Sequence, residues 1–224
     1  MKRDLVITID GPAGAGKSTA AAELARRLGL YFVSTGALYR ALAWAVRQAG
    51  LTPEDTPALR ALVERTTVTL EKEQVLVNGR DVTGEIRTPE ISELTFQLTK
   101  LRPVRDKMTP LQRAIAAKGG VVLEGRDTGS VVWPEADVKF YVDAALEERA
   151  RRRQGDLRRQ GHDVALADVT RVVDARDRED MRRELAPLVK PEGAVVVDST
   201  ALSPDEVVDV MLRAVEQAGC CIRR

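Results

Sequence analysis

The stretch LVITIDGPAGAGKST, residues 5–19, decides the fold of this chain. Leu5–Ile9 is a short run of apolar and β-branched residues, which is typical of a buried strand. A glycine-rich segment with the pattern GxxxxGK[ST] follows, and an alanine- and leucine-rich helical pattern runs from Ser18 to Leu28. A strand, a glycine-rich turn and a helix in this order predict a loop that wraps around phosphate groups.

The spacing of this motif has a mechanical cause. Its residues are Gly11, Pro12, Ala13, Gly14, Ala15, Gly16, Lys17 and Ser18, with Thr19 beside them. Glycine lets successive main-chain N–H groups point at an anion, and the helix adds the positive end of its dipole. Lys17 can reach the outer phosphates, and the Ser18 hydroxyl is placed to bind Mg²⁺. A chance match is the alternative, but the flanking strand and helix favour a site for ATP and Mg²⁺.

Strand and helix patterns alternate along most of the remaining chain. Further strands are predicted at Tyr31–Val33, Val121–Leu123, Val138–Val142 and Val195–Asp198, with helices at Thr35–Ala49, Glu90–Ala117 and Ser203–Ala218. This alternation predicts a parallel sheet covered by helices on both faces. Pro103 and Pro110 are expected to break the second helix, and Ser203 with Glu206 forms a capping box for the third.

One segment interrupts this alternation. Residues 68–83 contain two short runs of alternating apolar residues, and Asn78-Gly79 follows the second run as a strong turn signal. The segment therefore predicts a small antiparallel sheet inserted into the α/β pattern.

Composition limits the class of protein. Lys+Arg 35 and Asp+Glu 34 give a net charge of +1, which argues against a protein that coats nucleic acid or an anionic membrane. No apolar stretch approaches the length of a membrane span. The only cysteines, Cys220 and Cys221, lack metal-site spacing and fit a reducing compartment. We expect a cytoplasmic monomer that binds small molecules, with the single His162 in a surface loop.

Arginines are nonetheless concentrated in one part of the chain: Arg149, Arg151, Arg152, Arg153, Arg158 and Arg159, then Arg171, Arg176, Arg178, Arg182 and Arg183. This density indicates a compact polyanion as ligand, whereas the alternative is a solvated helix with acidic partners. No Asn-Lys-x-Asp element for reading guanine is present. A short chain with many arginines fits a kinase that holds two nucleotides, because phosphoryl transfer needs positioning and charge stabilisation.

Four further blocks accompany the glycine-rich motif: Ser34–Arg40 (STGALYR), Thr83–Thr88 (TGEIRT), Glu124–Asp127 (EGRD), and Arg176–Arg183 with Ala186-Pro187-Leu188 after it. In this order they resemble bacterial cytidylate kinases over nearly the whole chain. The resemblance implies a three-layer α/β P-loop fold with a central parallel sheet, and transfer of the γ-phosphoryl group of ATP to CMP or dCMP. It implies one kinase domain: a core (1–34, 106–146 and 166–224), a monophosphate-binding insert with a small antiparallel sheet (about 35–105), and an arginine-rich lid (about 147–165).

The resemblance also implies which residues contact the acceptor nucleotide. Thr35 and Arg40 match positions that bind its phosphate, and a helix start beside an arginine fork suits a dianion. Thr35 could instead be a plain N-cap. Arg105 and Asp127 match the pair that reads the pyrimidine edge, where a carboxylate can accept from the amino group of cytosine. The alternative for Arg105 is a surface residue at a helix end.

Other matched positions surround the transferred phosphoryl group. Arg126 resembles the arginine between the two substrates, and a structural ion pair is its alternative. Arg176 and Asp180 resemble a ribose-binding pair, and Arg183 resembles a phosphate-clamping arginine. Their spacing puts them on one helix face, where an exposed salt-bridged surface is the alternative. Together with Lys17, Arg126 and Arg183 are the expected catalytic residues.

The lid and the base contacts leave alternatives open. Arg149 and Arg153 are the candidates for meeting ATP. Phe96 stands where the family often has a serine that contacts the pyrimidine, so the preference between CMP and UMP is open. A kinase for UMP or another small acceptor, and a nucleotide-binding regulatory module without transfer activity, are the rival functions.

Overall fold

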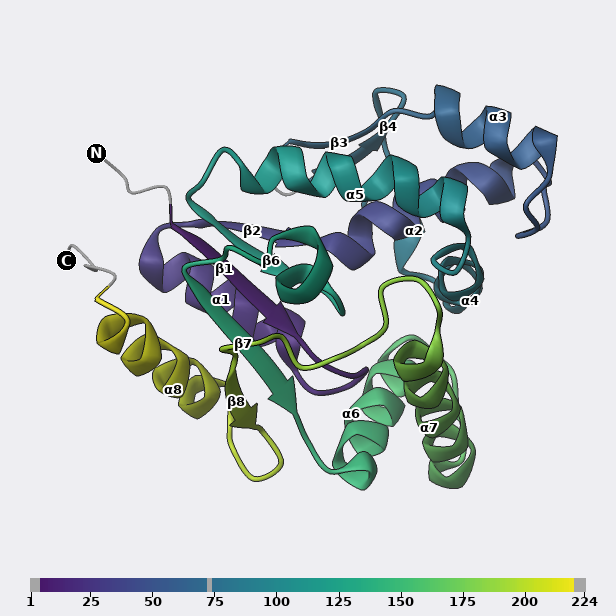
Figure 1. Ribbon diagram of the computed structural model, residues 1–224. Helices are drawn as coiled ribbons and strands as arrows, with labels where there is room; N and C mark the ends of the chain where they lie inside the picture. Colours follow the sequence, from purple (N-terminus) through teal and green to yellow (C-terminus); the bar gives the residue numbers. More distant parts are fainter. Residues whose placement is uncertain (1–4, 72–73, 220–224) are drawn as a thin grey trace. The chain divides into compact units, whose positions relative to one another are not determined.

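The computed structural model describes residues 5–71 and 74–219, and Cys220 and Cys221 lie outside this range. The elements, labelled as in Figure 1, are β1 (Val6–Asp10), α1 (Lys17–Leu28), β2 (Tyr31–Ser34), α2 (Thr35–Gln48), α3 (Pro57–Arg65), β3 (Val68–Glu71), β4 (Gln74–Val77), β5 (Arg80–Asp81), η1 (Glu85–Arg87), α4 (Pro89–Leu98), α5 (Arg102–Ala116), β6 (Val121–Glu124), η2 (Thr128–Val132), β7 (Val138–Asp143), α6 (Leu146–Arg159), α7 (Leu166–Arg182), β8 (Val195–Asp198) and α8 (Pro204–Gln217). The chain forms two compact units: residues 1–33 with 116–224, and residues 34–115.

The first unit is built on a five-stranded sheet with the order β2-β6-β1-β7-β8. The pairings of β1 with β6 and β7, and of β7 with β8, are parallel. Strand β1 lies in the middle of the sheet, so the loop that follows its carboxyl end opens where α/β proteins bind ligands. The predicted central parallel sheet is confirmed.

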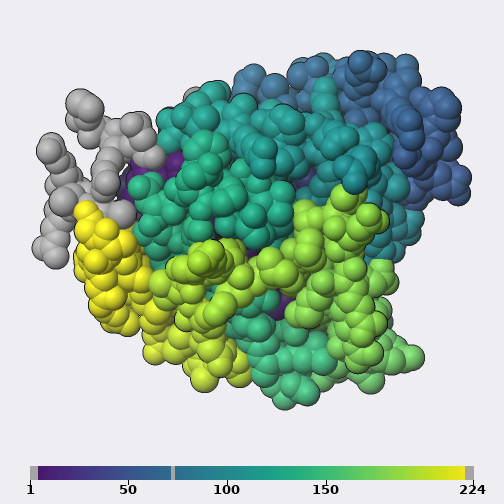
Figure 2. All heavy atoms as spheres, in the orientation of Figure 1, coloured from purple at the N-terminus to yellow at the C-terminus, as the bar shows by residue number. Residues whose placement is uncertain are grey.

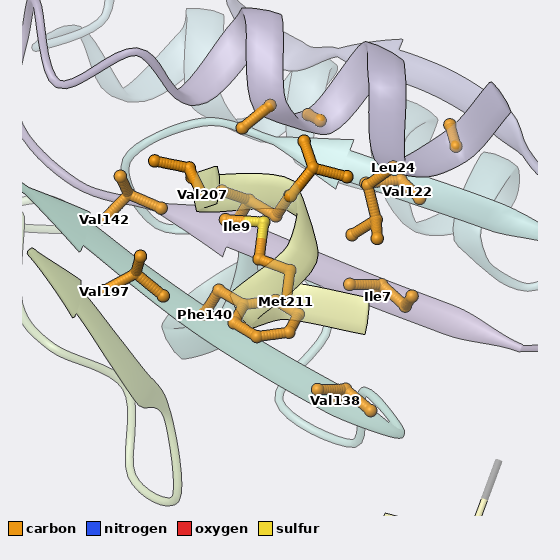
Figure 3. Packing of buried hydrophobic residues seen from close by; sticks show 14 of the residues in the cluster. Ile7, Ile9, Leu24, Val122, Val138, Phe140, Val142, Val197, Val207 and Met211 are labelled. Carbon is orange, nitrogen blue, oxygen red and sulfur yellow. The ribbon is translucent and has the colours of Figure 1, made fainter. Parts of the chain in front are cut away.

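One face of this sheet packs against α1 and α8 (Figure 3). Ile7 and Ile9 of β1 and Phe140 of β7 are fully buried there against Leu24 of α1 and Met211 of α8. Strand residues alternate between faces, so Thr8 and Asp10 of β1 point to the opposite face, where both are fully buried. Asp10, a charged residue buried at the end of this strand, therefore serves a purpose other than apolar packing.

Helices α6 and α7 form a hairpin within the first unit (Figure 1). Ala150 of α6 packs against Val169 and Val173 of α7 in a small apolar cluster of their own. The two helices thereby hold their many arginines on a defined scaffold.

The second unit joins helices to a three-stranded antiparallel sheet with the order β3-β4-β5. Val68 pairs with Val77, and Val77 also pairs with Arg80 across the Asn78-Gly79 turn. Asn78 adopts φ 50°, as this turn requires. The predicted small antiparallel sheet is confirmed, and the unit extends to residue 115 because α5 continues unbroken to Ala116.

Two helix expectations were wrong. The break in residues 90–117 falls at 99–101, and Pro110 lies inside α5 without ending it. Pro103 stands in the first turn of α5, where its missing N–H costs nothing. Pro110 and Asp106, whose carbonyl would otherwise accept from residue 110, are both exposed, so water can replace the lost bond. The sequence interpretation also omitted α3, which Thr56 caps and Pro57 begins.

Within the described ranges, no helix is both long enough and apolar enough to cross a membrane.

Candidate active site

The glycine-rich loop has the geometry that its spacing predicts. Gly11 and Gly14 adopt φ values of 144° and 77°, and Gly16 caps α1 in the left-handed region. A Cβ at Gly11 would lie 1.9 Å from the Val142 carbonyl oxygen, and one at Gly14 would lie 2.7 Å from the Arg149 carbonyl oxygen. Only glycine fits these positions, so the chain can curl and direct its N–H groups inward.

Lys17, the first residue of α1, points into this loop. Its side chain is 4% exposed, and Nζ donates a hydrogen bond of 2.6 Å to the Pro12 carbonyl oxygen. Burial lowers the pKa of Lys17 to about 7, and the nearby Arg126 guanidinium acts in the same direction. Phosphate oxygens would favour the charged form, so binding of a triphosphate would restore the ammonium.

Ser18 and Thr19 are exposed in the first turn of α1. A hydroxyl at this point suits a Mg²⁺ ion that takes its remaining ligands from water and nucleotide phosphates. Among the residues that the structure describes, no group of three His, Cys, Asp or Glu side chains could hold a metal alone. The donor set therefore fits a cation that arrives with the nucleotide.

Asp10 connects the phosphate loop to the segment after β6. Its Oδ1 accepts from the N–H and the hydroxyl of Thr128, each at 2.8 Å, and its Oδ2 accepts from the Gly129 N–H at 2.7 Å. A Cβ at Gly129 would lie 2.7 Å from Thr8 Oγ1 and 3.3 Å from Asp10 Oδ2. Burial raises the pKa of Asp10 to about 6 even though these donors oppose the shift. The contacts fix η2, and with it the EGRD turn, against β1.

Four charged residues predicted for the site gather beside this turn. Asp180 lies 3.4 Å from Arg126 (Oδ2 to Nε) and 3.3 Å from Arg183 (Oδ1 to Nη1). Arg183 Nη2 lies 3.4 Å from Asp127 Oδ1, and its Nε donates to the Ala186 carbonyl oxygen at 2.6 Å. Asp127 and Asp180 are buried, so the exposed-helix alternative for this face of α7 is wrong. We call Arg126, Asp127, Asp180 and Arg183 the charged cluster.

The chain after this cluster lies on the surface. Residues 184, 189 and 190 are exposed, and Figure 2 shows the yellow-green segment that joins α7 to β8 as a strip across the visible face. Leu188 N–H donates to the Asp180 carbonyl oxygen at 2.8 Å, which fastens the start of this segment to the end of α7. The APL block therefore folds back on the helix that carries the cluster.

The lid candidates occupy different surroundings on α6. Arg149 is buried, forms an ion pair with Asp177 of α7, and donates to the Ala13 carbonyl oxygen at 3.2 Å. Arg153 is partly buried, which lowers its pKa, and the Arg176 charge lies close enough to lower it further. Arg152 donates to the hydroxyl of Ser199 at 3.0 Å and to its carbonyl oxygen at 2.6 Å.

The second unit brings together Thr35 and Arg40, two residues predicted for the site, at the start of α2. Ser34, and not Thr35, caps the helix by accepting from the Ala37 N–H at 3.3 Å, so the N-cap alternative for Thr35 is wrong. Thr35 is buried in the first turn. The Arg40 guanidinium folds back over the same turn, since a Cβ at Gly36 would lie 3.3 Å from its Nη1. A helix start, a hydroxyl and an arginine suit a phosphate.

Arg105 is also held within the second unit. It is buried, which excludes the surface alternative, and its Nε donates to the Thr99 carbonyl oxygen at 2.9 Å. Nη1 donates to the Tyr39 hydroxyl at 3.3 Å. Phe96 lies at the end of α4 with the Lys100 ammonium 4.2 Å from its ring centre. Tyr39 thus orients a predicted base-reading arginine.

Sequence reasoning did not single out four of the residues that make these contacts: Asp10, Tyr39, Asp177 and Ser199. Tyr39 and Asp177 stand inside the recognised blocks STGALYR and Arg176–Arg183, which was an available signal. Asp10 and Ser199 pair with residues far along the chain, and no local pattern indicates such partners.

Comparisons with known proteins agree with this arrangement. The family described as cytidylate kinase matches residues 7–217. The chain is 45% identical over 216 residues to the cytidylate kinase of Symbiobacterium thermophilum, covering 94% of this chain and 96% of that protein. It is 46% identical over 213 residues to the cytidylate kinase of Carboxydothermus hydrogenoformans, covering 93% and 96%.

A solved structure supports the fold alone. An uncharacterized protein from Eubacterium ventriosum matches with a TM-score of 0.53 at 12% identity, covering 96% of this chain and 99% of that one. Sequence identity over nearly the full length of two curated relatives is the stronger finding. By its motifs, its sheet and this similarity, the chain belongs to the cytidylate kinase family.

Proposed function

We propose that this protein transfers the γ-phosphoryl group of ATP to CMP or dCMP and releases ADP with CDP or dCDP. Membership of the cytidylate kinase family is the observation that carries the proposal. The phosphate loop, with left-handed glycines and a buried lysine, supports ATP as the donor. The related assignments of a cytoplasmic location and a monomeric state remain predictions.

The loop supplies most of the donor site in this proposal. Main-chain N–H groups of Gly11 and of residues 13–16 surround the phosphates, Lys17 neutralises their outer oxygens, and Thr19 lies alongside. Ser18 would hold a Mg²⁺ ion, which when bound supplies charge neutralisation between the phosphates. Arg153 of α6 contributes a further positive charge on this side, close to Arg176.

The acceptor is bound through its phosphate, base and ribose. Thr35 and Arg40 bind the phosphate at the start of α2, Arg105 and Asp127 bind the pyrimidine, and the pair Arg176 and Asp180 binds the ribose. The hydrogen bonds of Arg105 to the Tyr39 hydroxyl and to the Thr99 carbonyl oxygen support a fixed role for that side chain. A hydrogen-bonding side chain that is already fixed suits base recognition, because little of it must be ordered on binding.

The transfer itself needs no separate base. An oxygen of the acceptor phosphate attacks the γ-phosphorus while the bond to the ADP oxygen breaks, and no proton has to leave the acceptor first. Lys17, Arg126 and Arg183 stabilise the negative charge that spreads over the transferred group. The ion pairs of Arg126 and Arg183 with Asp180 support this role, because they restrict both guanidinium groups before substrate arrives.

An acceptor panel tests the function. ADP release would be measured with Mg·ATP and CMP, dCMP, UMP, AMP or shikimate, alongside a Lys17→Ala variant whose folding is checked by circular dichroism. We expect turnover with CMP and dCMP that the variant loses while it stays folded. Release of ADP with AMP or shikimate but not with CMP would overturn the assignment, and equal turnover with UMP would replace it by a general pyrimidine acceptor.

A further inference from the structure

The carbonyl groups of the phosphate loop present a hydrogen-bonding problem of their own. When successive N–H groups point inward at an anion, the carbonyl oxygens between them point away and need donors elsewhere. Side chains donate to three of these oxygens in the structure. Pro12 accepts from Lys17 at 2.6 Å, Ala13 accepts from Arg149 at 3.2 Å, and Ala15 accepts from the Ser199 hydroxyl at 3.0 Å.

The donor to Ala13 is itself held in place. Arg149 is 8% exposed; its Nε donates to the Ala144 carbonyl oxygen at 2.9 Å, and its Nη1 is shared between Ala13 and Asp177. Asp177 is 5% exposed, so the pair is formed away from solvent. A guanidinium with its fork fixed at three points presents a donor to the loop at a fixed position.

Backbone packing brings Arg149 against the same loop. The Gly14 Cα approaches the Arg149 main chain so closely that a Cβ there would lie 2.7 Å from its carbonyl oxygen and 3.0 Å from its Cβ. Helix α6 thus touches the loop through a side chain at Ala13 and through the backbone at Gly14. A displacement of Arg149 would act directly on the peptides that are to receive phosphate.

We propose that Arg149 and Asp177 form a positioning pair that sets the conformation of the phosphate loop through the Ala13 carbonyl. The proposal rests on the proposed function for the identity of ATP as the ligand. It assigns Arg149 to the loop and not to direct contact with ATP. Asp177 acts through Arg149, because its carboxylate holds the guanidinium that reaches the Ala13 carbonyl, and the same carboxylate also interacts with the main-chain N–H of Ala13.

The test is an equilibrium titration with a fluorescent ATP analogue in the absence of any acceptor. Asp177→Asn, Arg149→Lys and the double variant are compared with wild type. Matched controls are Asp174→Asn and Arg178→Lys, which alter an exposed pair on α7 with an Nη2–Oδ2 distance of 2.6 Å. Lysine can keep a charge opposite Asp177, but it lacks the fork that also reaches the two carbonyl groups.

Each single variant is expected to raise the Kd for the analogue about tenfold, the scale of a lost hydrogen bond to a charged group. The double variant is expected to bind the analogue no more weakly than the weaker-binding single variant, because both changes act on the same contact with Ala13. At saturating ATP, we expect the KM of each variant for CMP to stay within about twofold of the wild-type value. Both control variants are expected to stay within about twofold of wild type in every assay.

Two outcomes would overturn the positioning role. One is a Kd within twofold of wild type in folded Arg149→Lys, which decides the matter even if Asp177→Asn fails to fold. The other is a double variant whose loss equals the product of the single losses, since independent residues do not form a pair. A wild-type protein that binds the analogue but does not phosphorylate CMP would refute the proposed function and leave this titration valid.

Discussion

Asp10, the last residue of β1, accepts two hydrogen bonds of 2.8 Å from Thr128, the first residue of η2. These residues lie 118 positions apart in the sequence, yet they join the start of the phosphate loop to the turn that carries Arg126 and Asp127. The geometry of the phosphate loop and of the charged cluster therefore depends on one buried carboxylate.

Asp10→Asn should destabilise this connection. Asp10 receives three hydrogen bonds on two oxygens, whereas an asparagine would turn its NH₂ group toward at least one of the donors. We expect a loss of about 2 kcal/mol in the free energy of unfolding, as for an unsatisfied buried group, and a lower kcat. Denaturant titration and steady-state kinetics measure both. Asp209→Asn, which removes an exposed partner of Arg27, is the control and should change stability by less than about 0.5 kcal/mol.

The same carboxyl gives stability a definite dependence on pH. Its pKa is about 6 in the folded protein and 3.8 ordinarily, so between these values the folded state binds more protons than the unfolded state. The contribution of Asp10 is therefore fully present below pH 3.8 and is lost as the pH rises through 6, by about 3 kcal/mol in all. The difference in the free energy of unfolding between wild type and Asp10→Asn, measured from pH 4 to pH 7, should show this decrease. A difference that does not change with pH would contradict it.

Two glycines should respond in opposite ways to alanine. A Cβ at Gly129 would lie 2.7 Å from Thr8 Oγ1 and 3.1 Å from Pro191 Cγ, so Gly129→Ala should cost at least about 1 kcal/mol. Gly155 lies inside α6, where the nearest atom to a new Cβ is Arg159 Nη1 at 3.7 Å. Gly155→Ala should stabilise the protein by about 0.5–1 kcal/mol. Thermal unfolding of both variants provides the measurement. A Gly129→Ala variant as stable as wild type would contradict the packing around Gly129, and a destabilised Gly155→Ala variant would contradict the open space beside α6.

Local features of the sequence predicted the core of the fold. The apolar run before Gly11 and the alanine-rich run after Ser18 predicted β1 and α1 within one residue, because strand and helix here follow from short-range pattern alone. The Ser203 capping box is also local and is confirmed. The expected helix break at Pro110 was wrong because the rule for prolines takes no account of exposure. On the exposed side of α5, water can replace the hydrogen bond that Pro110 cannot make.

Long-range pairings escaped prediction for a different reason. Arginine density around Arg149 indicated an anion, but the sequence could not separate an arginine that faces ligand from one paired inside the protein. Asp177 and Asp180 stand three residues apart in one helix, yet one contacts Arg149 and the other contacts Arg126. Which partner each carboxylate meets is set by how α6, α7 and the β6–η2 turn pack, and packing is a tertiary property.

Asp127 provides a test of base recognition. In the proposed site its carboxylate accepts from the amino group of cytosine, which uracil lacks, and Arg183 at 3.4 Å orients it. Asp127→Ala should raise the KM for CMP about tenfold or more, with a smaller effect on the KM for UMP, so the CMP/UMP ratio of kcat/KM should narrow. Steady-state kinetics with both nucleotides give the ratio. An unchanged ratio would remove Asp127 from base reading and leave it as a support for Arg183.

The pKa of Lys17 leads to a prediction about protons. In the free protein this pKa is about 7, so at pH 8 most molecules carry a neutral Lys17. Phosphate oxygens stabilise the ammonium, so ATP binding at pH 8 should take up close to one proton, whereas at pH 6 Lys17 is already charged and uptake should be near zero. Calorimetric titrations in buffers of different ionisation enthalpy measure the number of protons directly. Lys17→Met should abolish uptake at pH 8 wherever its binding remains measurable. If wild type took up the same number of protons at pH 6 and at pH 8, Lys17 would already be charged in the free protein. The effect of its burial would then have to be offset by the negative charges of Glu124 and Asp10, which act to raise the pKa of Lys17.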